Sequence, residues 1–160
     1  PYRYIFCTNL QKKLNFAAML DERIIEFISE HHVMSLACAA NGDLWCASCF
    51  YVFLEEEMSF IITSEEHTRH AQLFMENPVV AGTIALETET VGKIRGLQFR
   101  AVVEKCYGSL FDKYRIAYLK RFPYAILKGG EIWRLVLTEL KYTDNRLGFG
   151  KKLYWESRTP

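Results

Sequence analysis

The alternation of apolar and polar residues divides the chain into short apolar runs, separated by turn residues and by three helical patterns. Apolar residues at 24, 25 and 28, after acidic residues in the first turn, predict a helix over residues 21–32. Similar spacing predicts a helix from Ser64 to Asn77-Pro78 and another over residues 110–121. The remaining apolar runs, rich in β-branched and aromatic residues, predict strands over residues 33–40, 44–54, 58–63, 79–86, 90–107, 132–142 and 147–155.

These elements predict a mainly β fold. Asn41-Gly42-Asp43 is typical of a hairpin turn, and Gly92 and Gly96 in the longest predicted strand suggest a bulge or a barrel corner. Several antiparallel strands with a few inserted helices favour a small barrel with peripheral helices. No repeat or linker divides the pattern, so we expect one domain over residues 19–160. We interpret residues 1–18, which precede Met19, as an N-terminal extension or a segment added to the natural chain.

Composition narrows the class of protein. Half of the 160 residues are hydrophobic and 14% are aromatic, which excludes a disordered chain. The 20 basic and 19 acidic residues give a net charge of +1, so we expect no nucleic-acid partner. No apolar run approaches the ~20 residues that cross a bilayer, so we expect no membrane partner. Five cysteines, an odd number, with no secretory signal pattern, predict a reduced, cytoplasmic protein.

The strongest chemical candidate is the junction between the predicted strand 58–63 and the helix after it. Hydroxyl and cationic side chains meet there, at Thr63, Ser64, Thr68, Arg69 and His70. A helix start has free backbone N–H groups and a partial positive charge, which favour a phosphate. The alternative is an ordinary helix capped by Ser64, with a solvated polar face. Glu65 and Glu66 favour this alternative, because acids suit a helix start and repel a phosphate.

Two further motifs are weaker candidates. Cys46 and Cys49 form a C-x-x-C, but residues three apart in a strand face opposite sides, so a disulfide or a shared metal would need a bulge. His67 and His70 could complete a zinc set, although their spacing is tighter than usual. We therefore interpret the cysteines as structural and expect no metal. Residues 147–152 lack the ending of a phosphate loop and predict a bent strand, from which Lys151 could reach an anion.

The order of these pieces resembles the FMN-binding split barrels related to pyridoxamine 5′-phosphate oxidase. That superfamily has a strand ending in a Tyr-Thr-Asn-like triplet, then Ser-Arg-Lys-Ala and a helix closing on Asn-Pro. Here Ile61-Ile-Thr-Ser64, Thr68-Arg-His-Ala71 and Asn77-Pro78 stand in those places, with one extra loop residue. Residues 95–99, 121–123, 142–145 and 147–152, with Trp155, look closer still to an uncharacterised bacterial branch of these barrels. The resemblance covers residues 20–155.

The resemblance implies a six-stranded antiparallel split β-barrel with flanking helices. It also implies a homodimer with two FMN molecules at its interface. The residues implied to contact the cofactor are Thr63, Ser64, Thr68, Arg69 and His70 around the phosphate, Ser48, Cys49 and Phe50 along the flavin and ribityl chain, and Arg95 and Gln98 from the neighbouring subunit.

Two departures from the family pattern qualify the function. His70 replaces the phosphate-binding lysine and is only partly charged near neutrality, so we expect a weaker or pH-tuned phosphate affinity. Residues 146–149 lack the histidine of the oxidase's substrate motif, which argues against pyridoxamine-phosphate oxidation. The sequence thus predicts an FMN-binding oxidoreductase, with no catalytic residue or substrate identified. The alternatives are a non-enzymatic flavin- or heme-binding sensor or carrier, and a structural dimer with a decayed flavin site.

Overall fold

The computed structural model describes residues 20–127, 129–148 and 150–157, which form eight strands and three α-helices. The strands are β1 (Val33–Ala40), β2 (Asp43–Phe50), β3 (Val52–Leu54), β4 (Ser59–Ser64), β5 (Val79–Ala85), β6 (Arg95–Lys105), β7 (Glu131–Asp144) and β8 (Lys152–Glu156). The helices are α2 (Glu22–Glu30), α3 (Arg69–Glu76) and α4 (Gly108–Arg121). The expected extension, residues 1–18, lies outside the described residues. No helix in the described part of the chain is long and apolar enough to cross a membrane.

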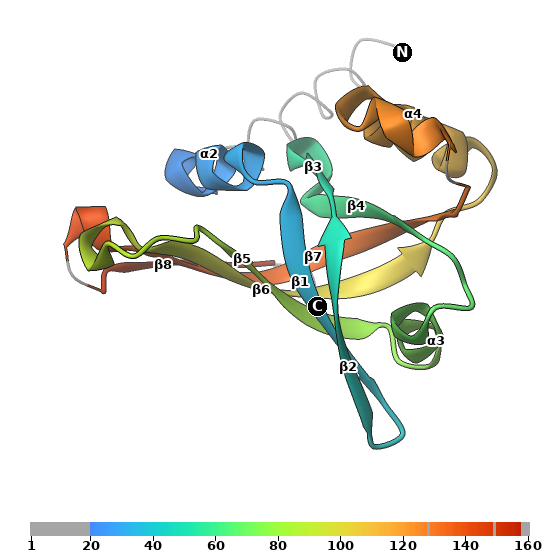
Figure 1. The fold of residues 1–160 in the computed structure, drawn as a ribbon, viewed down its shortest axis with the longest axis horizontal. Coiled ribbons are helices and arrows are strands. Elements are labelled where there is room, and N and C mark those ends of the chain that lie inside the picture. The colour runs from blue at the N-terminus through green and yellow to red at the C-terminus, as the bar shows by residue number, and fades with distance from the viewer. Residues whose placement is uncertain (1–19, 128, 149, 158–160) are drawn as a thin grey trace, which may run out of the picture.

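The strands form one antiparallel sheet that curls back on itself (Figure 1). Its order is β2-β1-β5-β6-β7-β4-β3, with β8 paired to β7 outside this path. The two ends of the order, β2 and β3, are consecutive in the chain and are separated only by Tyr51. A single stretch of chain therefore pairs with β1 along its first half and with β4 along its second half, which closes the sheet.

The mainly β fold is confirmed, but the expected number of six strands was too low. The predicted strand 44–54 is divided at Tyr51, because the chain changes its pairing partner there. The short β8 adds a further strand beside β7. The hairpin turn between β1 and β2 is confirmed, since Asn41 and Gly42 both have positive φ, at 50° and 82°. The bulge expected near Gly92 or Gly96 was misplaced, because the register of β6 shifts between Arg100 and Ala101.

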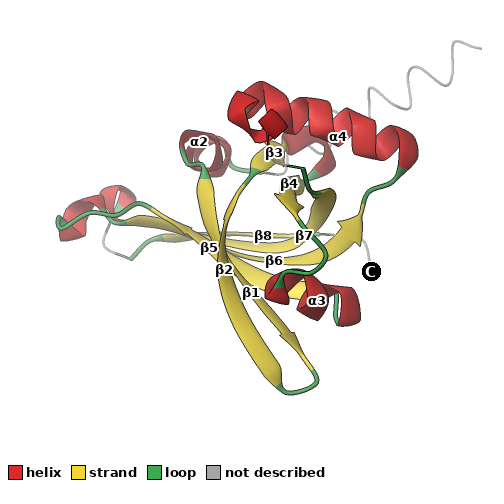
Figure 2. Cartoon of the chain, turned by 45° about the vertical axis from the view of Figure 1, so that its right-hand side comes forward, coloured by secondary structure: helices red, strands yellow, loops and turns green. Residues whose placement is uncertain are grey.

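Side chains from other elements hold the C-terminal end of α2. The Tyr51 hydroxyl donates to the carbonyl of Ile28 at 2.7 Å. The Arg121 guanidinium, at the end of α4, donates to the carbonyls of Ser29 and His31 at 3.0 and 2.6 Å. Helix ends leave carbonyl groups without intrahelical partners, so these bonds satisfy α2 and fix its position at once. Figure 2 shows α2 and α4 on one side of the curled sheet and α3 on the other.

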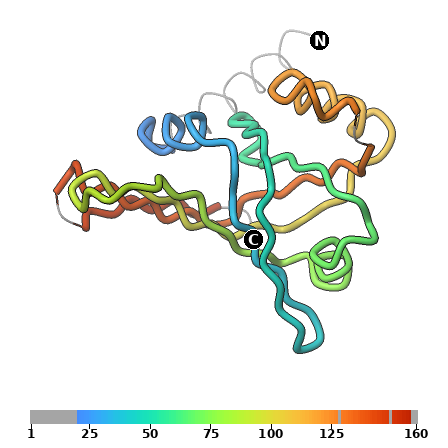
Figure 3. Tube along the Cα trace, viewed as in Figure 1, coloured from blue at the N-terminus to red at the C-terminus, as the bar shows by residue number. Residues whose placement is uncertain are grey.

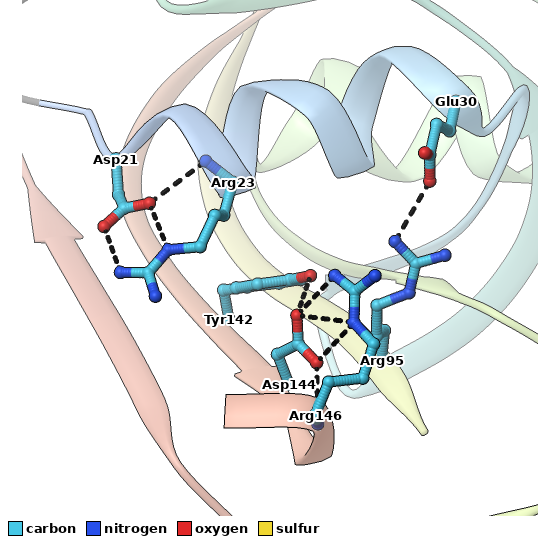
Figure 4. A network of polar contacts seen from close by, with 7 residues as sticks. All are labelled: Asp21, Arg23, Glu30, Arg95, Tyr142, Asp144 and Arg146. Atoms are coloured by element: carbon cyan, nitrogen blue, oxygen red, sulfur yellow. Dashed lines mark hydrogen bonds and ion pairs between the residues drawn. The ribbon is translucent and has the colours of Figure 1, made fainter. Parts of the chain in front are cut away.

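The connections after β5 and β7 form an arm at the far end of the sheet. Figure 3 shows the two chain segments lying side by side. The Asn145 side chain donates to the carbonyl of Val91 at 2.8 Å and joins them. At the base of the arm the fully buried Asp144 carboxylate accepts from the Tyr142 hydroxyl at 3.1 Å and from the Arg146 backbone at 3.0 Å and guanidinium at 2.7 Å (Figure 4). These bonds lower the pKa of Asp144, and the hydrogen bonds from the Arg146 guanidinium contribute most to this lowering.

A group of aromatic rings packs together within the largely aliphatic core inside the curled sheet. Phe60 lies at its centre, with ring centroids 4.9 Å from Tyr51 and 5.2 Å from Phe99. The Phe99 ring covers Gly82 on the neighbouring strand β5, where an added Cβ would stand 2.3 Å from the ring. Gly82 therefore makes room for an aromatic side chain that its strand neighbour supplies.

We expect Gly82→Ala to destabilise the protein by about 1–3 kcal/mol, the range for overpacking a core. The new methyl group would also meet the backbone oxygen of Ser35 at 2.6 Å, which cannot move aside as a side chain can. Chemical denaturation measures the loss. Gly92→Ala is the matched control, because nothing lies within 4 Å of an added Cβ there. Equal stabilities of the two variants would contradict the packing argument.

We expect Asp144→Asn to destabilise the protein by about 2–3 kcal/mol at pH 7, because it removes a buried charge that holds the Arg146 guanidinium. The folded-state pKa of Asp144 lies below that of the unfolded chain, so its contribution is present above about pH 4 and is lost as the pH falls through the folded-state value. Denaturation at pH 7 and pH 3 should therefore show a smaller difference from wild type at pH 3. The exposed Asp112→Asn is the control. A difference that does not change with pH would refute the assignment.

Candidate functional site

The barrel has an open seam between the edges of β2 and β4. The stretch of chain that forms β2 and β3 pairs with β4 only through β3, and this pairing ends at Val52–Ile61. If the same register continued, Phe50 would face Thr63 and Cys49 would face Ser64. Among the described residues no such pairing occurs: β2 pairs there with β1 alone, and β4 with β7 alone. The seam is thus defined by residues 48–50 and 62–64, whose facing strand edges carry backbone N–H and C=O groups outside any ladder.

Three polar side chains gather at the end of the seam, where β4 gives way to α3. The Ser64 hydroxyl lies 2.7 Å from His70 Nε2 and 3.0 Å from the Thr68 hydroxyl. Trp133 Nε1–H donates to the carbonyl of Ser64 at 2.9 Å and fixes the end of β4. The alternative in which Ser64 caps the helix was wrong, because α3 begins later and Thr68 is its N-cap residue. The Thr68 hydroxyl donates to the carbonyl of Glu65 at 2.8 Å, so it does not cap α3 either.

His70 is closer to a neutral polar group than to a cation. Burial lowers its pKa below the ordinary value, because taking the ring out of water disfavours its charged form. Its Nε2 is engaged with the Ser64 hydroxyl. Any pH dependence that His70 confers on anion binding therefore moves below the range expected from the sequence.

Arg69, the predicted phosphate ligand, is engaged by the β1–β2 hairpin. Its Nη2 donates to Asp43 Oδ1 at 2.6 Å and its Nε to Asp43 Oδ2 at 3.2 Å. Its guanidinium also lies 4.3 Å from the ring centroid of Trp45. About half of each charged side chain is exposed, 50% for Arg69 and 46% for Asp43. The sequence did not identify Asp43 or Trp45 as neighbours of Arg69.

The two glutamates at the junction have partners within the chain. Glu66 pairs with Lys105, whose side chain is only 16% exposed and whose Nζ lies 3.3 Å from Glu131 as well. Glu65 Oε2 lies 3.2 Å from His67 Nε2. Lys105 thus balances Glu66, an acid that the sequence placed as an obstacle to phosphate. In the sequence, Lys105 is only a lysine near the end of a long predicted strand, and this position does not reveal its pairing with Glu66.

Not all of the predicted residues meet at the junction. Arg95 and Lys105 are the first and last residues of the 11-residue strand β6, so they lie roughly 30 Å apart. Arg95 instead pairs with Glu30 of α2 at 3.0 Å, at the far end of the sheet (Figure 4). Lys151 lies there too, because its carbonyl accepts from the backbone of Asp144. Within one chain, neither Arg95 nor Lys151 reaches the junction of β4 and α3.

The outer face of the sheet carries a hollow of about 650 Å³. Small side chains line most of it, including Ser35, Ala37, Cys46, Ala81 and Thr83, and the predicted residue Gln98 lies at its border. Leu44 lines the hollow whereas its neighbour Trp45 contacts Arg69, and successive residues of a strand point to opposite faces. The hollow and Arg69 therefore lie on opposite faces of the β1–β2 hairpin.

The cysteines lie as the strand period predicts. Cys46 is exposed and Cys49 is buried, on opposite faces of β2, and both are free thiols. Burial raises the pKa of Cys49 to about 11 and that of Cys38 to about 12, so both stay protonated near neutrality. In the part of the chain that the structure describes, no group of three or more His, Cys, Asp or Glu side chains is placed to hold a metal ion.

Sequence comparison finds close bacterial relatives. A UPF0306 protein of Yersinia pseudotuberculosis is 42% identical to this chain over 137 residues, which are 86% of this chain and 93% of that protein. No protein-family model matches the chain.

Structural comparison finds more distant proteins of the same fold. A heme-binding protein from Mycobacterium smegmatis matches with a TM-score of 0.69 and 16% identity, covering 81% of this chain and 55% of that protein. HutZ, the heme storage protein of Vibrio cholerae, matches with a TM-score of 0.64 and 21% identity, covering 74% of this chain and 90% of that protein. An FAD-binding protein from Mesorhizobium loti matches with a TM-score of 0.62 and 12% identity, covering 76% of this chain and 92% of that protein. These neighbours are split-barrel proteins of the pyridoxamine 5′-phosphate oxidase-like kind, so the predicted resemblance is confirmed.

Proposed function

The chain belongs to the UPF0306 family, and we propose that it is a flavoprotein that binds FMN along the seam, with the phosphate where β4 meets α3. The observation that carries this proposal is the open seam itself. Its two unpaired strand edges end at a helix start beside the Ser64 and Thr68 hydroxyls and Arg69. An extended ligand with a phosphate at one end matches this arrangement of backbone groups and anion donors.

The residues present fit a phosphate at this place. Thr68 does not cap α3, so the first N–H groups of the helix are not taken by its hydroxyl. The Arg69 guanidinium adds hydrogen-bond donors, and the Ser64 and Thr68 hydroxyls add one each when they turn from their present partners, which for Thr68 is the carbonyl of Glu65. Glu66 is balanced by Lys105 and repels an anion less than an unpaired acid. His70 acts here as a neutral hydrogen-bonding group and not as a replacement for the family's lysine.

The remaining cofactor-binding residues line the seam on the β2 side. Phe50 is 55% exposed, and its ring centroid lies 5.3 Å from that of Phe122. Such an exposed ring offers an apolar surface to a flat aromatic ligand. The backbone groups of Ser48 and Phe50 face the seam, because Tyr51 N–H and, two residues earlier, the Cys49 backbone point toward β1, while the Cys49 side chain is buried in the core. When bound, the flavin supplies the redox chemistry of an oxidoreductase, and the chain positions it and limits its contact with water.

Heme is the second candidate ligand, because two structural neighbours are named as heme proteins. The same seam offers an apolar surface at Phe50 and an imidazole at His70. The names of these neighbours, a heme-binding protein and a heme storage protein, fit the sensor or carrier alternative. Titration with hemin, followed by the heme absorbance band, separates this candidate from the flavin.

The outer face of the sheet supports a homodimer as part of the same proposal. Small side chains line its hollow, so a second copy can approach closely. Arg95 lies roughly 30 Å from the junction of its own chain, which favours the partner as the source of its predicted contact with a flavin. Gln98 borders the hollow and reaches the same interface.

We expect the purified protein to bind FMN with a dissociation constant in the micromolar range or below. Arg69→Ala should weaken this binding by about 1.5–3 kcal/mol, or roughly ten- to a hundredfold, as for the loss of a charge-assisted hydrogen bond. Quenching of flavin fluorescence measures both constants. Arg115→Ala is the control, because it removes the same charge from α4, on the other side of the sheet. Wild-type protein that fails to bind high-micromolar FMN would sink the proposal.

We expect size-exclusion chromatography with light scattering to give twice the mass of the chain. Ala81→Glu should convert the dimer to a monomer, because it places a long side chain among the small ones that line the hollow. Ile116→Glu, at a 69% exposed position on α4, should leave the dimer intact. Circular dichroism confirms that both variants fold. A monomeric wild type, or a dimer that survives Ala81→Glu, would place any interface elsewhere.

A further inference from the structure

Asp43 holds the side chain that the proposed phosphate needs. Its two carboxylate oxygens accept from Nε and Nη2 of Arg69, while Trp45 lies against the guanidinium. Such a two-point contact uses the same planar fork by which arginine binds a phosphate. Arg69 is therefore already bound to an anion, which the chain itself supplies.

The hairpin that carries Asp43 is held in place by other bonds. Asn41 Nδ2 donates to Glu76 Oε2 at 2.5 Å, and Asn77 Nδ2 donates to the carbonyl of Ala39 at 2.7 Å. Both bonds join the hairpin to the C-terminal end of α3, whereas Asp43 meets the first residue of that helix. The hairpin thus keeps its position without the Asp43–Arg69 pair, and Asp43 stays close to any anion bound at the helix start.

Charge and exposure indicate which anion prevails. An ion pair between half-exposed side chains contributes about 0–1 kcal/mol, because water and salt screen it. A phosphate monoester carries up to two charges and three acceptor oxygens, and the start of α3 offers it further donors. A bound phosphate therefore outcompetes the Asp43 carboxylate for Arg69, but it must also bear the repulsion of that nearby negative charge.

We propose that Asp43 is an internal competitor for the anion site, which occupies Arg69 until a phosphate-bearing ligand displaces it. This inference rests on the proposed function and adds a determinant of selectivity to it. Only a ligand with a strongly charged group gains by taking Arg69 from Asp43. A flavin without a phosphate leaves the pair intact and gains nothing from Arg69.

The test compares FMN with riboflavin, which lacks the phosphate, across matched variants. Asp43→Asn should lower the dissociation constant for FMN about three- to tenfold, the scale of releasing an exposed ion pair and removing a like charge. It should leave the constant for riboflavin unchanged. In an Arg69→Ala background the same substitution should give a clearly smaller gain, because only the repulsion of the nearby charge is then relieved. Asp112→Asn, an exposed change on α4 that alters net charge equally, should have no effect.

A second measurement follows the ion pair without any ligand. Trp45 is 43% exposed, whereas Trp133 and Trp155 are 2% and 7% exposed, so acrylamide quenching of tryptophan fluorescence reports chiefly on Trp45. Asp43→Asn should increase the quenching, because Arg69 is then no longer held against the Trp45 ring. Trp45→Phe identifies the signal by removing it.

The outcomes separate this proposal from the flavin proposal. If the wild type binds FMN and Asp43→Asn binds it equally or more weakly, the competitor role is overturned and the flavin proposal stands. Binding of FMN by Asp43→Asn but not by wild type supports the competitor role and contradicts FMN binding by the natural chain. Failure of both proteins to bind FMN overturns both proposals. Unchanged quenching in Asp43→Asn also overturns the competitor role, since Arg69 would then keep its place without Asp43.

Discussion

The change of pairing partner at Tyr51 is the constraint on which the rest of the structure depends. One continuous stretch of chain pairs with β1 before this residue and with β4 after it, and among the described strands no other closes the curled sheet. Tyr51 is fully buried at this point, with its ring 4.9 Å from Phe60 and its hydroxyl bonded to the end of α2. Burial raises the pKa of that hydroxyl, so it stays protonated and keeps donating to the α2 carbonyl.

The same constraint creates the seam. Because β2 follows β1 away from β4, the pairing of this stretch of chain with β4 is limited to β3 and ends at Val52–Ile61. Their free edges then need other partners, since unpaired backbone groups away from water are costly. The proposed ligand would supply such partners. The candidate site is in this sense a consequence of how the barrel closes.

The charged side chains at the junction of β4 and α3 form ion pairs within the chain. Arg69 is matched by Asp43 and Lys105 by Glu66, while His70 is neutral by burial. A phosphate that binds at this place would have to compete with carboxylates of the chain for the cationic side chains. It would not meet unpaired positive charges. Affinity and selectivity then depend on how tightly each internal pair is held, and exposed pairs yield more easily than buried ones.

Local signals were sufficient for the regular elements. Helical spacing identified all three described helices, and positive-φ preferences identified the Asn41-Gly42 turn. The helix start at Arg69 was less well predicted, because capping by Ser64 and by Thr68 have the same local signature. The association of Thr63 and Ser64 with residues 48–50 followed from the resemblance to a family and not from any local pattern, since the seam depends on how distant strands pair.

The sequence by itself determined the strands, the helices and the residue types that gather where β4 meets α3, because hydrophobic period and turn preference act over a few neighbouring residues. Only the tertiary structure decided which charges meet. Asp43 reaches Arg69 across 26 residues of chain, and Lys105 reaches Glu66 across 39. Such pairs form because the closing sheet brings distant strand ends together, and no local rule relates a carboxylate in a hairpin to an arginine on a later helix.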